Sequence, residues 1–263
     1  MNSPETSVRY EREGYVGILT LDRGDGLNRM SPELLDDFEG AVDAEQRDSQ
    51  IRCLLIRARG RCFCAGADLR GPLQREPRPG AESPAERSYG MYRPFLRVLD
   101  IEVPTLAALN GAAVGGGLGL ALVCDLRIAS TEARLGANFV RLGLHPGMAL
   151  TYLLPLLAGV SRASDLLYSA RLVDAEEALQ MGLVNRVVAS DALEHEALQW
   201  AHSIAANAAQ ALRATKRSLR RFVPAELKEW AFLEASAQAE SLQSSEAKEG
   251  VAAQLEGRKA HFP

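Results

Sequence analysis

Two glycine-rich segments contain the residues whose types and spacing could do chemistry in this chain. They run over residues 61–69 (RCFCAGADL) and 110–119 (NGAAVGGGLG). Each follows a predicted strand, and its small side chains leave the main-chain N–H groups open to close approach by another group. A pair of such N–H groups can stabilise a developing oxyanion. Glycine clusters also allow a strand and a helix to pack tightly, so either segment alone leaves both interpretations open.

Other catalytic or metal-binding patterns are not found. Leu120 stands where the dinucleotide pattern G-x-G-x-x-G needs its last glycine, and no P-loop, H-E-x-x-H or G-x-S-x-G pattern occurs. Cys62 and Cys64 are too closely spaced for the usual metal knuckle, and no second pair completes a site. We therefore predict no metal, and we expect all four cysteines to be reduced and structural.

Composition and charge narrow the classes of function. The 263 residues are 47% hydrophobic and 24% charged, which suits a globular protein with a large core. The net charge of −4 does not suit a nucleic-acid-binding surface. The first residues lack the features of a secretory signal, and no apolar run is long enough to span a membrane. We expect a cytoplasmic protein with no nucleic-acid or membrane partner.

Strands and helices alternate around the two segments. Ser31 followed by Pro32 predicts the start of an amphipathic helix that continues to about Arg47. Residues 71–83, rich in Pro, Arg and Glu, are expected to form a loop at a rim. From about Asp191 onward we predict one helix after another. The alternation is typical of an α/β fold, with strands predicted at residues 16–21, 51–57, 105–109 and 126–129.

Six motifs in order resemble those of the enoyl-CoA hydratase/isomerase (crotonase) superfamily. The resemblance covers nearly the whole chain without a large gap, which makes it far more specific than one glycine triplet. It includes both glycine-rich segments and a G-x-x-P-G turn. The motifs lie at residues 21–28, 63–69, 110–129, 143–147, 174–188 and 249–262.

The resemblance implies a crotonase (ClpP-like) fold of stacked β-β-α units with a C-terminal helical region. Residues 1–195 would form the core with an acyl-CoA site, and residues 196–263 would mediate assembly. A homo-oligomer, either a trimer or a dimer of trimers, is expected on the same ground. The substrate would be an acyl-CoA thioester, with coenzyme A as part of the substrate and no separate cofactor.

The resemblance also assigns site residues. The N–H groups of Ala67 and Gly116 would be the two oxyanion-hole donors. Arg61 and Arg70, with Arg258 and Lys259 near the end of the chain, would lie near the phosphates of CoA. The remaining residues expected to bind substrate are Leu27, Ala65, Asp68, Leu69, Gly115, Gly119, Phe139 and Phe262.

Two positions depart from the family pattern. The hydratases carry one catalytic glutamate three residues after the donor glycine and another four residues before the glycine of G-x-x-P-G. These positions are Gly119 and Phe139 in this chain. Because neither residue can transfer a proton, hydration through the usual pair of carboxylates is not expected.

Three hypotheses therefore stay open. Hydration or isomerisation could use a relocated acid or base, of which His145 is the first candidate and Asp68 the second. A malonyl-type thioester could be decarboxylated, with Phe139 as an apolar wall beside the carboxylate. The chain could also bind acyl-CoA without turnover. Some of these side chains also have a purely structural interpretation. Asp68 would then cap a following helix, and Asp125 would cap or pair at the start of a strand. Tyr89 and Tyr92 would either pack in the core or close over the acyl chain.

Overall fold

The computed structural model describes residues 6–71, 73, 83–221 and 223–262. Two sheets run through this part, one of six strands in the order β1-β2-β3-β5-β7-β10 and one of four in the order β4-β6-β8-β9. Neighbouring strands are parallel except for the pairs β1/β2 and β8/β9. The larger sheet is formed by β1 (Val8–Glu13), β2 (Val16–Leu21), β3 (Cys53–Ala58), β5 (Thr105–Leu109), β7 (Leu126–Ser130) and β10 (Arg186–Val188), and the smaller by β4 (Cys62–Cys64), β6 (Ala112–Val114), β8 (Arg134–Gly136) and β9 (Leu172–Asp174).

Successive strands alternate between the sheets. β3, β5 and β7 belong to the larger sheet, and each is followed directly by a short strand of the smaller one. A helix then leads back to the next unit, so the expected stacked β-β-α units are confirmed. The helices are α1 (Pro32–Arg47), α2 (Pro84–Leu96), α3 (Gly116–Val123), α4 (Leu150–Ala158), α5 (Val160–Ser169), α6 (Ala175–Gln180), α7 (Leu193–Ala205), α8 (Ala209–Leu219), α9 (Val223–Ser241) and α10 (Ser245–Glu256), with the 3₁₀ helices η1 (Arg97–Asp100) and η2 (Phe139–Leu142).

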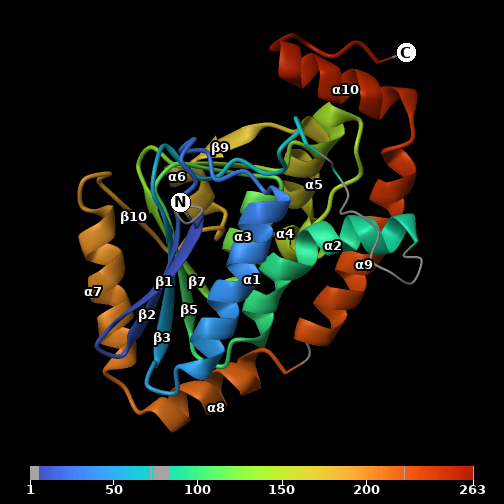
Figure 1. Ribbon diagram of the computed structural model, residues 1–263. Coiled ribbons are helices and arrows are strands. Elements are labelled where there is room, and N and C mark those ends of the chain that lie inside the picture. Colours follow the sequence, from blue (N-terminus) through green and yellow to red (C-terminus); the bar gives the residue numbers. More distant parts are fainter. Residues whose placement is uncertain (1–5, 72, 74–82, 222, 263) are drawn as a thin grey trace, which may run out of the picture.

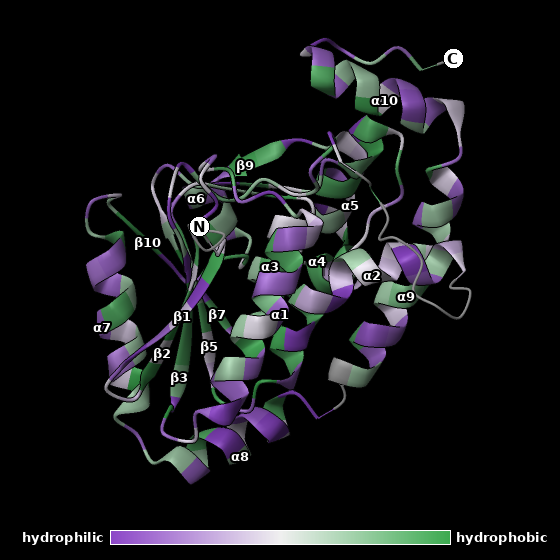
Figure 2. Ribbon diagram, viewed as in Figure 1, coloured by the Kyte–Doolittle hydropathy of each residue, from purple (hydrophilic) through white to green (hydrophobic). Residues whose placement is uncertain are grey.

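Helices cover both faces of the larger sheet. α1 and α3 lie on one face and α7 lies on the other (Figure 1). All six residues of β2 are buried, as expected for a parallel strand with both faces covered. Figure 2 shows the central strands as a green apolar layer between helices whose outer surfaces carry purple, hydrophilic residues. Among the described residues, no helix combines the length and the apolar composition that crossing a bilayer requires.

Most of the predicted elements are confirmed. α1 begins after Ser31, whose hydroxyl accepts a hydrogen bond from the Leu34 N–H at 3.3 Å, and it ends at Arg47. The strand expected at residues 51–57 begins instead at Cys53, because Ile51 and Arg52 still belong to the preceding turn. β1 and the three-residue strands of the smaller sheet were not predicted. The expected loop at residues 71–83 lies mostly outside the described residues.

The four cysteines are free and buried, as predicted. Burial raises the pKa of the Cys53, Cys64 and Cys124 thiols to about 12. A thiol with such a pKa stays protonated at neutral pH and behaves as a small apolar side chain.

Asp125 ties α8 to the sheet, which confirms the interpretation of this residue as a structural cap or ion-pair partner. Its carboxylate accepts the Thr105 N–H at 2.8 Å and pairs with Lys216 at 2.8 Å and Arg220 at 2.6 Å. Burial alone would raise the pKa of Asp125, but the two cations outweigh burial and hold that pKa below its usual value. The half-buried carboxylate thus has a cationic partner on each oxygen.

Glu45 on α1 makes stability depend on pH. The side chain is buried, and its Oε2 has no hydrogen-bond partner among the described residues. Burial, opposed in part by Lys216, raises the pKa of Glu45 from 4.5 to about 7. The folded protein therefore holds this proton more tightly than the unfolded chain does. The stabilisation is fully present below about pH 4.5 and is lost as the pH rises to about 7.

Glu45→Gln should remove this dependence because glutamine carries no charge at any pH. The free energy of unfolding of the wild type should fall by about 3 kcal/mol relative to the variant between about pH 4.5 and about pH 7. Urea denaturation at several pH values measures the difference. The exposed Glu240→Gln change serves as the control and should follow the wild type. Parallel pH profiles for wild type and Glu45→Gln would contradict the assignment.

Candidate functional site

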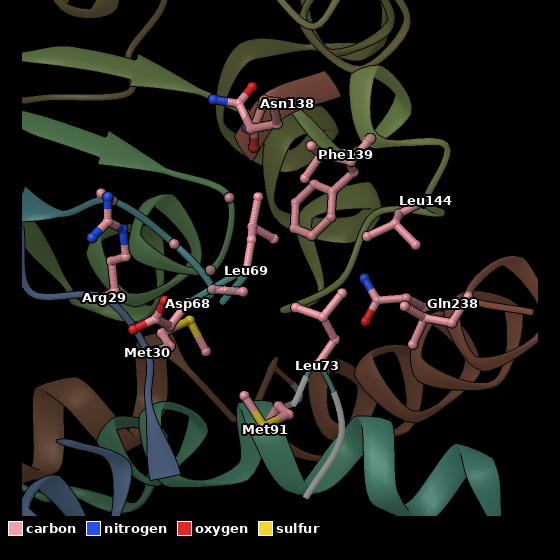
Figure 3. A pocket seen from close by; sticks show the side chains of 18 of the residues that line it. Arg29, Met30, Asp68, Leu69, Leu73, Met91, Asn138, Phe139, Leu144 and Gln238 are labelled. Atoms are coloured by element: carbon pink, nitrogen blue, oxygen red, sulfur yellow. The ribbon is translucent and has the colours of Figure 1, made fainter. Parts of the chain in front are cut away.

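A cavity of about 260 Å³ opens where both glycine-rich segments meet helices from later in the chain. Its walls come from the loop after β4, the first turn of α3, η2, α2, α9 and α10. Figure 3 shows the Phe139 ring beside Leu69 and Leu144, with Arg29 and Asp68 on one side and Gln238 on the other. The lining residues are Arg29, Met30, Ala65, Gly66, Ala67, Asp68, Leu69, Arg70, Leu73, Met91, Tyr92, Gly115, Gly116, Asn138, Phe139, Leu142, Leu144, Gln238, Leu242, Gln254 and Leu255.

The loop after β4 is held in place by the segment before α1. The Ala65 N–H donates to the Leu27 carbonyl oxygen at 3.0 Å, and Met30 forms a parallel bridge with Ala67. The main-chain N–H groups of Met30 and Asp68 are both hydrogen-bonded. Met30 donates to the Gly66 carbonyl oxygen, and Asp68 donates to the Met30 carbonyl oxygen. The Ala67 N–H has no acceptor among the described residues. This donor is therefore available at the cavity wall.

The first turn of α3 forms the adjoining part of the wall. Gly115 precedes it with φ +56° and ψ −121°, a backbone conformation that L residues rarely adopt. A Cβ on Gly117 would lie 2.1 Å from the Cys64 carbonyl oxygen, so only glycine allows α3 to sit this close to β4. Gly116 is the first residue of the helix, and its N–H has no acceptor in the part of the chain that the structure describes.

Two main-chain donors without an acceptor among the described residues therefore lie at one cavity. Ala67 and Gly116 both line it, and each can donate to an oxygen atom of a ligand. The position at a helix N-terminus adds the positive end of the α3 dipole to the Gly116 donor. The geometry suits a ligand whose oxygen gains negative charge.

The two departures from the family pattern have different surroundings. Phe139 follows β8 and lines the cavity, as expected for a substrate-binding residue. Gly119 does not line it, because Met148 occupies the adjacent space. A Cβ on Gly119 would lie 2.4 Å from the Met148 Cβ. Met148 itself has φ +64°, an uncommon conformation for a residue with a long side chain.

Asp68 lines the cavity but does not cap a helix, so that interpretation was wrong. Its carboxylate pairs with Arg23 at 2.8 Å and also accepts the Arg70 N–H at 3.3 Å. The described residues directly after it, 69–71, form a turn and a bend and begin no helix. Burial would raise the pKa of Asp68, but the Arg23 guanidinium outweighs burial and holds that pKa below its usual value. Asp68 is therefore ionised at neutral pH.

His145 lies outside the cavity lining. Its Nδ1 is 2.7 Å from the Pro146 carbonyl oxygen, and its N–H donates to the Ser241 hydroxyl at 3.1 Å. These contacts place it against α9. The predicted acid–base role of His145 gains no support from this position.

The residues expected near CoA are spread over the surface around the site. Arg70 is exposed and lines the cavity, and Arg61 is exposed at the start of β4. Lys259 and Phe262 line a second cavity beside α10, which shares Gln254 with the first. Arg258 pairs with Glu249 at 2.6 Å. Leu27 does not line the cavity, and its carbonyl oxygen accepts the Ala65 N–H of the loop after β4.

Among the described residues of α9, one lines the cavity, and the sequence analysis did not single it out. Gln238 accepts the Tyr92 hydroxyl at 2.5 Å and donates to the His145 carbonyl oxygen at 2.9 Å. Tyr92 lines the cavity, whereas Tyr89 stacks edge-on against Phe232. The sequence did contain a signal for Gln238, because this polar residue lies on the same helix as the buried Ala231, Ala235 and Ala239. Within the described ranges, no group of three His, Cys, Asp or Glu side chains could hold a metal ion.

Comparison with known proteins agrees with this arrangement. A family model described as enoyl-CoA hydratase/isomerase matches residues 11–263. The chain belongs to the enoyl-CoA hydratase/isomerase family. It is 33% identical over 259 residues to the crotonyl-CoA hydratase of Syntrophomonas wolfei, with 97% of each chain covered. It is 32% identical over 256 residues to the short-chain-enoyl-CoA hydratase of Clostridium acetobutylicum, with 96% of each covered.

The fold comparison gives the same family. An enoyl-CoA hydratase/isomerase from Pseudoalteromonas atlantica superposes with a TM-score of 0.86 at 34% identity. The match covers 98% of this chain and all of the other. The crotonase fold expected from the sequence is thus confirmed for this member of the enoyl-CoA hydratase/isomerase family.

The packing of Met148 against Gly119 can be tested in this family member. Gly119→Ala should lower the free energy of unfolding by about 1–3 kcal/mol, because the new Cβ overlaps that of Met148. Met148 is fully buried, so Met148→Gly is itself destabilising, and the double variant should lose less stability than the sum of the two single variants. Urea denaturation of the single and double variants measures both effects.

Gly40→Ala provides the matched control. Gly40 lies in α1, and a Cβ there would meet nothing within 4 Å, so alanine should be neutral or stabilising by up to about 1 kcal/mol. A Gly119→Ala variant as stable as wild type would show that Met148 can move away.

Proposed function

We propose that the protein processes acyl-CoA thioesters and holds the thioester oxygen between the N–H groups of Ala67 and Gly116. The observation that carries the proposal is a pair of main-chain donors that line one cavity and have no acceptor among the described residues. The names of the Syntrophomonas and Clostridium relatives, both hydratases of enoyl-CoA compounds, support the choice of a CoA thioester. We take this pair as the oxyanion hole.

The proposed chemistry is stabilisation of a thioester enolate. When a bond at the α-carbon breaks, negative charge moves onto the carbonyl oxygen. One preorganised donor at such an oxygen is worth about 2.7–4 kcal/mol in a water-poor site. Gly116 adds the favourable end of the α3 dipole.

The CoA part would extend from the cavity mouth along exposed basic residues. Arg70 lies at the mouth and Arg61 at the start of β4, so both are candidates to contact phosphates. Lys259 and Phe262 lie on the second cavity, where they would contact CoA after assembly of several copies. A trimer or a dimer of trimers, with residues 196–263 contributing to assembly, and a cytoplasmic location complete the proposal.

One observation favours decarboxylation of a malonyl-type thioester as the specific reaction. At the two positions where the family resemblance implies glutamates, the cavity has the Phe139 ring and the space at Gly119 is filled by Met148. In decarboxylation the electrons of the C–C bond pass into the enolate, CO₂ leaves, and water returns a proton to the α-carbon. Phe139 would desolvate the carboxylate that leaves.

The reaction can be identified with a panel of CoA thioesters, enoyl and malonyl types together, analysed by mass spectrometry after incubation with the protein. Loss of CO₂ from a malonyl-type thioester is the expected result. Gain of water on an enoyl thioester would overturn decarboxylation and indicate a relocated acid–base group. If thioesters bind but none changes, a binding protein is indicated. Failure of every thioester to bind would overturn the proposed function.

The donor pair is tested by Ala67→Pro, which removes one N–H. Turnover of whichever thioester reacts should fall about 10²–10³-fold, as for the loss of one oxyanion-hole donor elsewhere. Ala67→Gly keeps the N–H and serves as the matched control, with turnover expected near that of wild type. Circular dichroism and thermal unfolding verify that both variants fold. Equal turnover in Ala67→Pro and Ala67→Gly would remove this donor from the mechanism.

A further inference from the structure

The side of the cavity around Gln238 is mostly apolar and contains this one buried amide. Leu73, Met91, Leu144 and Leu242 line the cavity together with Gln238, whose residue surface is only 4% exposed. Figure 3 shows the amide extending from α9 toward Leu144 and Leu73. A polar group in such surroundings is costly unless its hydrogen bonds are made. Gln238 therefore needs partners that the apolar lining cannot supply.

The amide is fixed in one orientation. Because the His145 carbonyl oxygen can only accept, the Nε2 of Gln238 must face it, at 2.9 Å. The Oε1 then faces the Tyr92 hydroxyl, at 2.5 Å. Tyr92 is itself confined, since a Cβ on Gly147 would lie 2.4 Å from its hydroxyl oxygen. The two bonds preorganise the amide before any ligand enters.

Half of the hydrogen-bonding capacity of Gln238 stays unused. A glutamine amide has two N–H donors and two acceptor lone pairs, and the bonds to His145 and Tyr92 use one of each. No further bond of this amide is made within the described residues. One N–H on Nε2 and one lone pair on Oε1 thus remain without a partner among the described residues, in an amide that lines the cavity.

The charges around the amide favour a neutral partner. Glu234 lies one helical turn earlier on α9, and its buried Oε2 has no partner in the described part of the chain. A ligand carboxylate would be placed near that acidic group. Arg29, a cation of the lining, lies on the opposite side of the cavity (Figure 3). A hydroxyl group both donates and accepts, so it can meet the free lone pair and the free N–H.

We infer that Gln238 is a specificity residue that binds a hydroxyl group on the acyl chain, remote from the thioester. The preferred substrate class is then an acyl-CoA whose chain carries a neutral oxygen at its far end. This inference rests on the proposed function, because it assumes that the acyl chain of a CoA thioester occupies the cavity. Tyr92 is the positioning residue that holds the amide.

Binding of matched saturated thioesters tests the inference without any dependence on turnover. Isothermal titration calorimetry compares each acyl-CoA with its terminally hydroxylated and terminally carboxylated forms over medium chain lengths, at which the terminal group lies far from the α-carbon and no member is a malonyl-type thioester. Wild type should bind the hydroxylated form at least tenfold more tightly than the parent at one or more lengths, and the carboxylated form most weakly. The preference should disappear in Gln238→Leu, which should bind the parent at least as well as wild type does.

Two further variants keep the test decisive. Tyr92→Phe leaves the Gln238 amide in place but frees its Oε1, so the preference should shrink without vanishing. Gln243→Leu changes an exposed glutamine just beyond α9 and should keep the full preference. Thermal unfolding verifies that each variant is folded.

The contrary outcomes are distinct. Equal binding of hydroxylated and parent thioesters by wild type, tightest binding of the carboxylated form, or a preference that survives Gln238→Leu would overturn the specificity role alone. If no thioester of any kind binds to wild type, both this inference and the proposed function fail.

Discussion

The near contact of two backbones, β4 and the first turn of α3, determines where both amide donors lie. A Cβ on Gly117 would overlap the Cys64 carbonyl group, so a side chain there would push the helix away from the smaller sheet. Met30 links the two walls, because its sulfur fills the space beside Gly116 while its backbone bridges Ala67. A displacement of either wall therefore changes the separation of the two N–H groups. Hydrogen bonds weaken steeply outside their preferred geometry. The ability of both N–H groups to bind one oxygen atom therefore depends on this packing.

Polar contacts, rather than a broad apolar face, fix the position of α9. Its buried alanines bring the helix close to α2, but small side chains alone would allow it to rotate. Gln238 and Glu234 prevent rotation, since Gln238 bonds to Tyr92 and Glu234 accepts the Thr151 N–H at 2.7 Å. The second contact also caps α4, whose own N-cap residue has no side-chain bond. One helix thus closes the cavity and completes the start of another.

Sequence patterns predict the parts of this fold that have strong local signals. The Ser31 cap and its proline locate α1, and buried apolar runs locate the central strands. β1 was not predicted, because most of its residues, VRYERE, are charged. Only Val8 is buried, as is typical of an edge strand. The strands of the smaller sheet have three residues each, too few to show a period. Both predicted donors fall on one cavity, whereas Met148 and Gln238 come from distant segments whose contacts no local pattern reveals.

The charged and polar groups of the cavity suit a reaction that depends on stabilisation of an oxyanion rather than on proton transfer by a side chain. The titratable side chains of the described lining are Arg29, Asp68, Arg70 and Tyr92. Asp68 is held ionised by Arg23, and burial raises the pKa of Tyr92 well above its usual value. Neither exchanges a proton readily near neutral pH, whereas the addition of water needs both a base for water and an acid for the α-carbon. Decarboxylation forms the enolate by breaking a C–C bond, so its main demand is a stabilised oxygen charge. Two main-chain donors beside an apolar ring meet that demand without any titratable group.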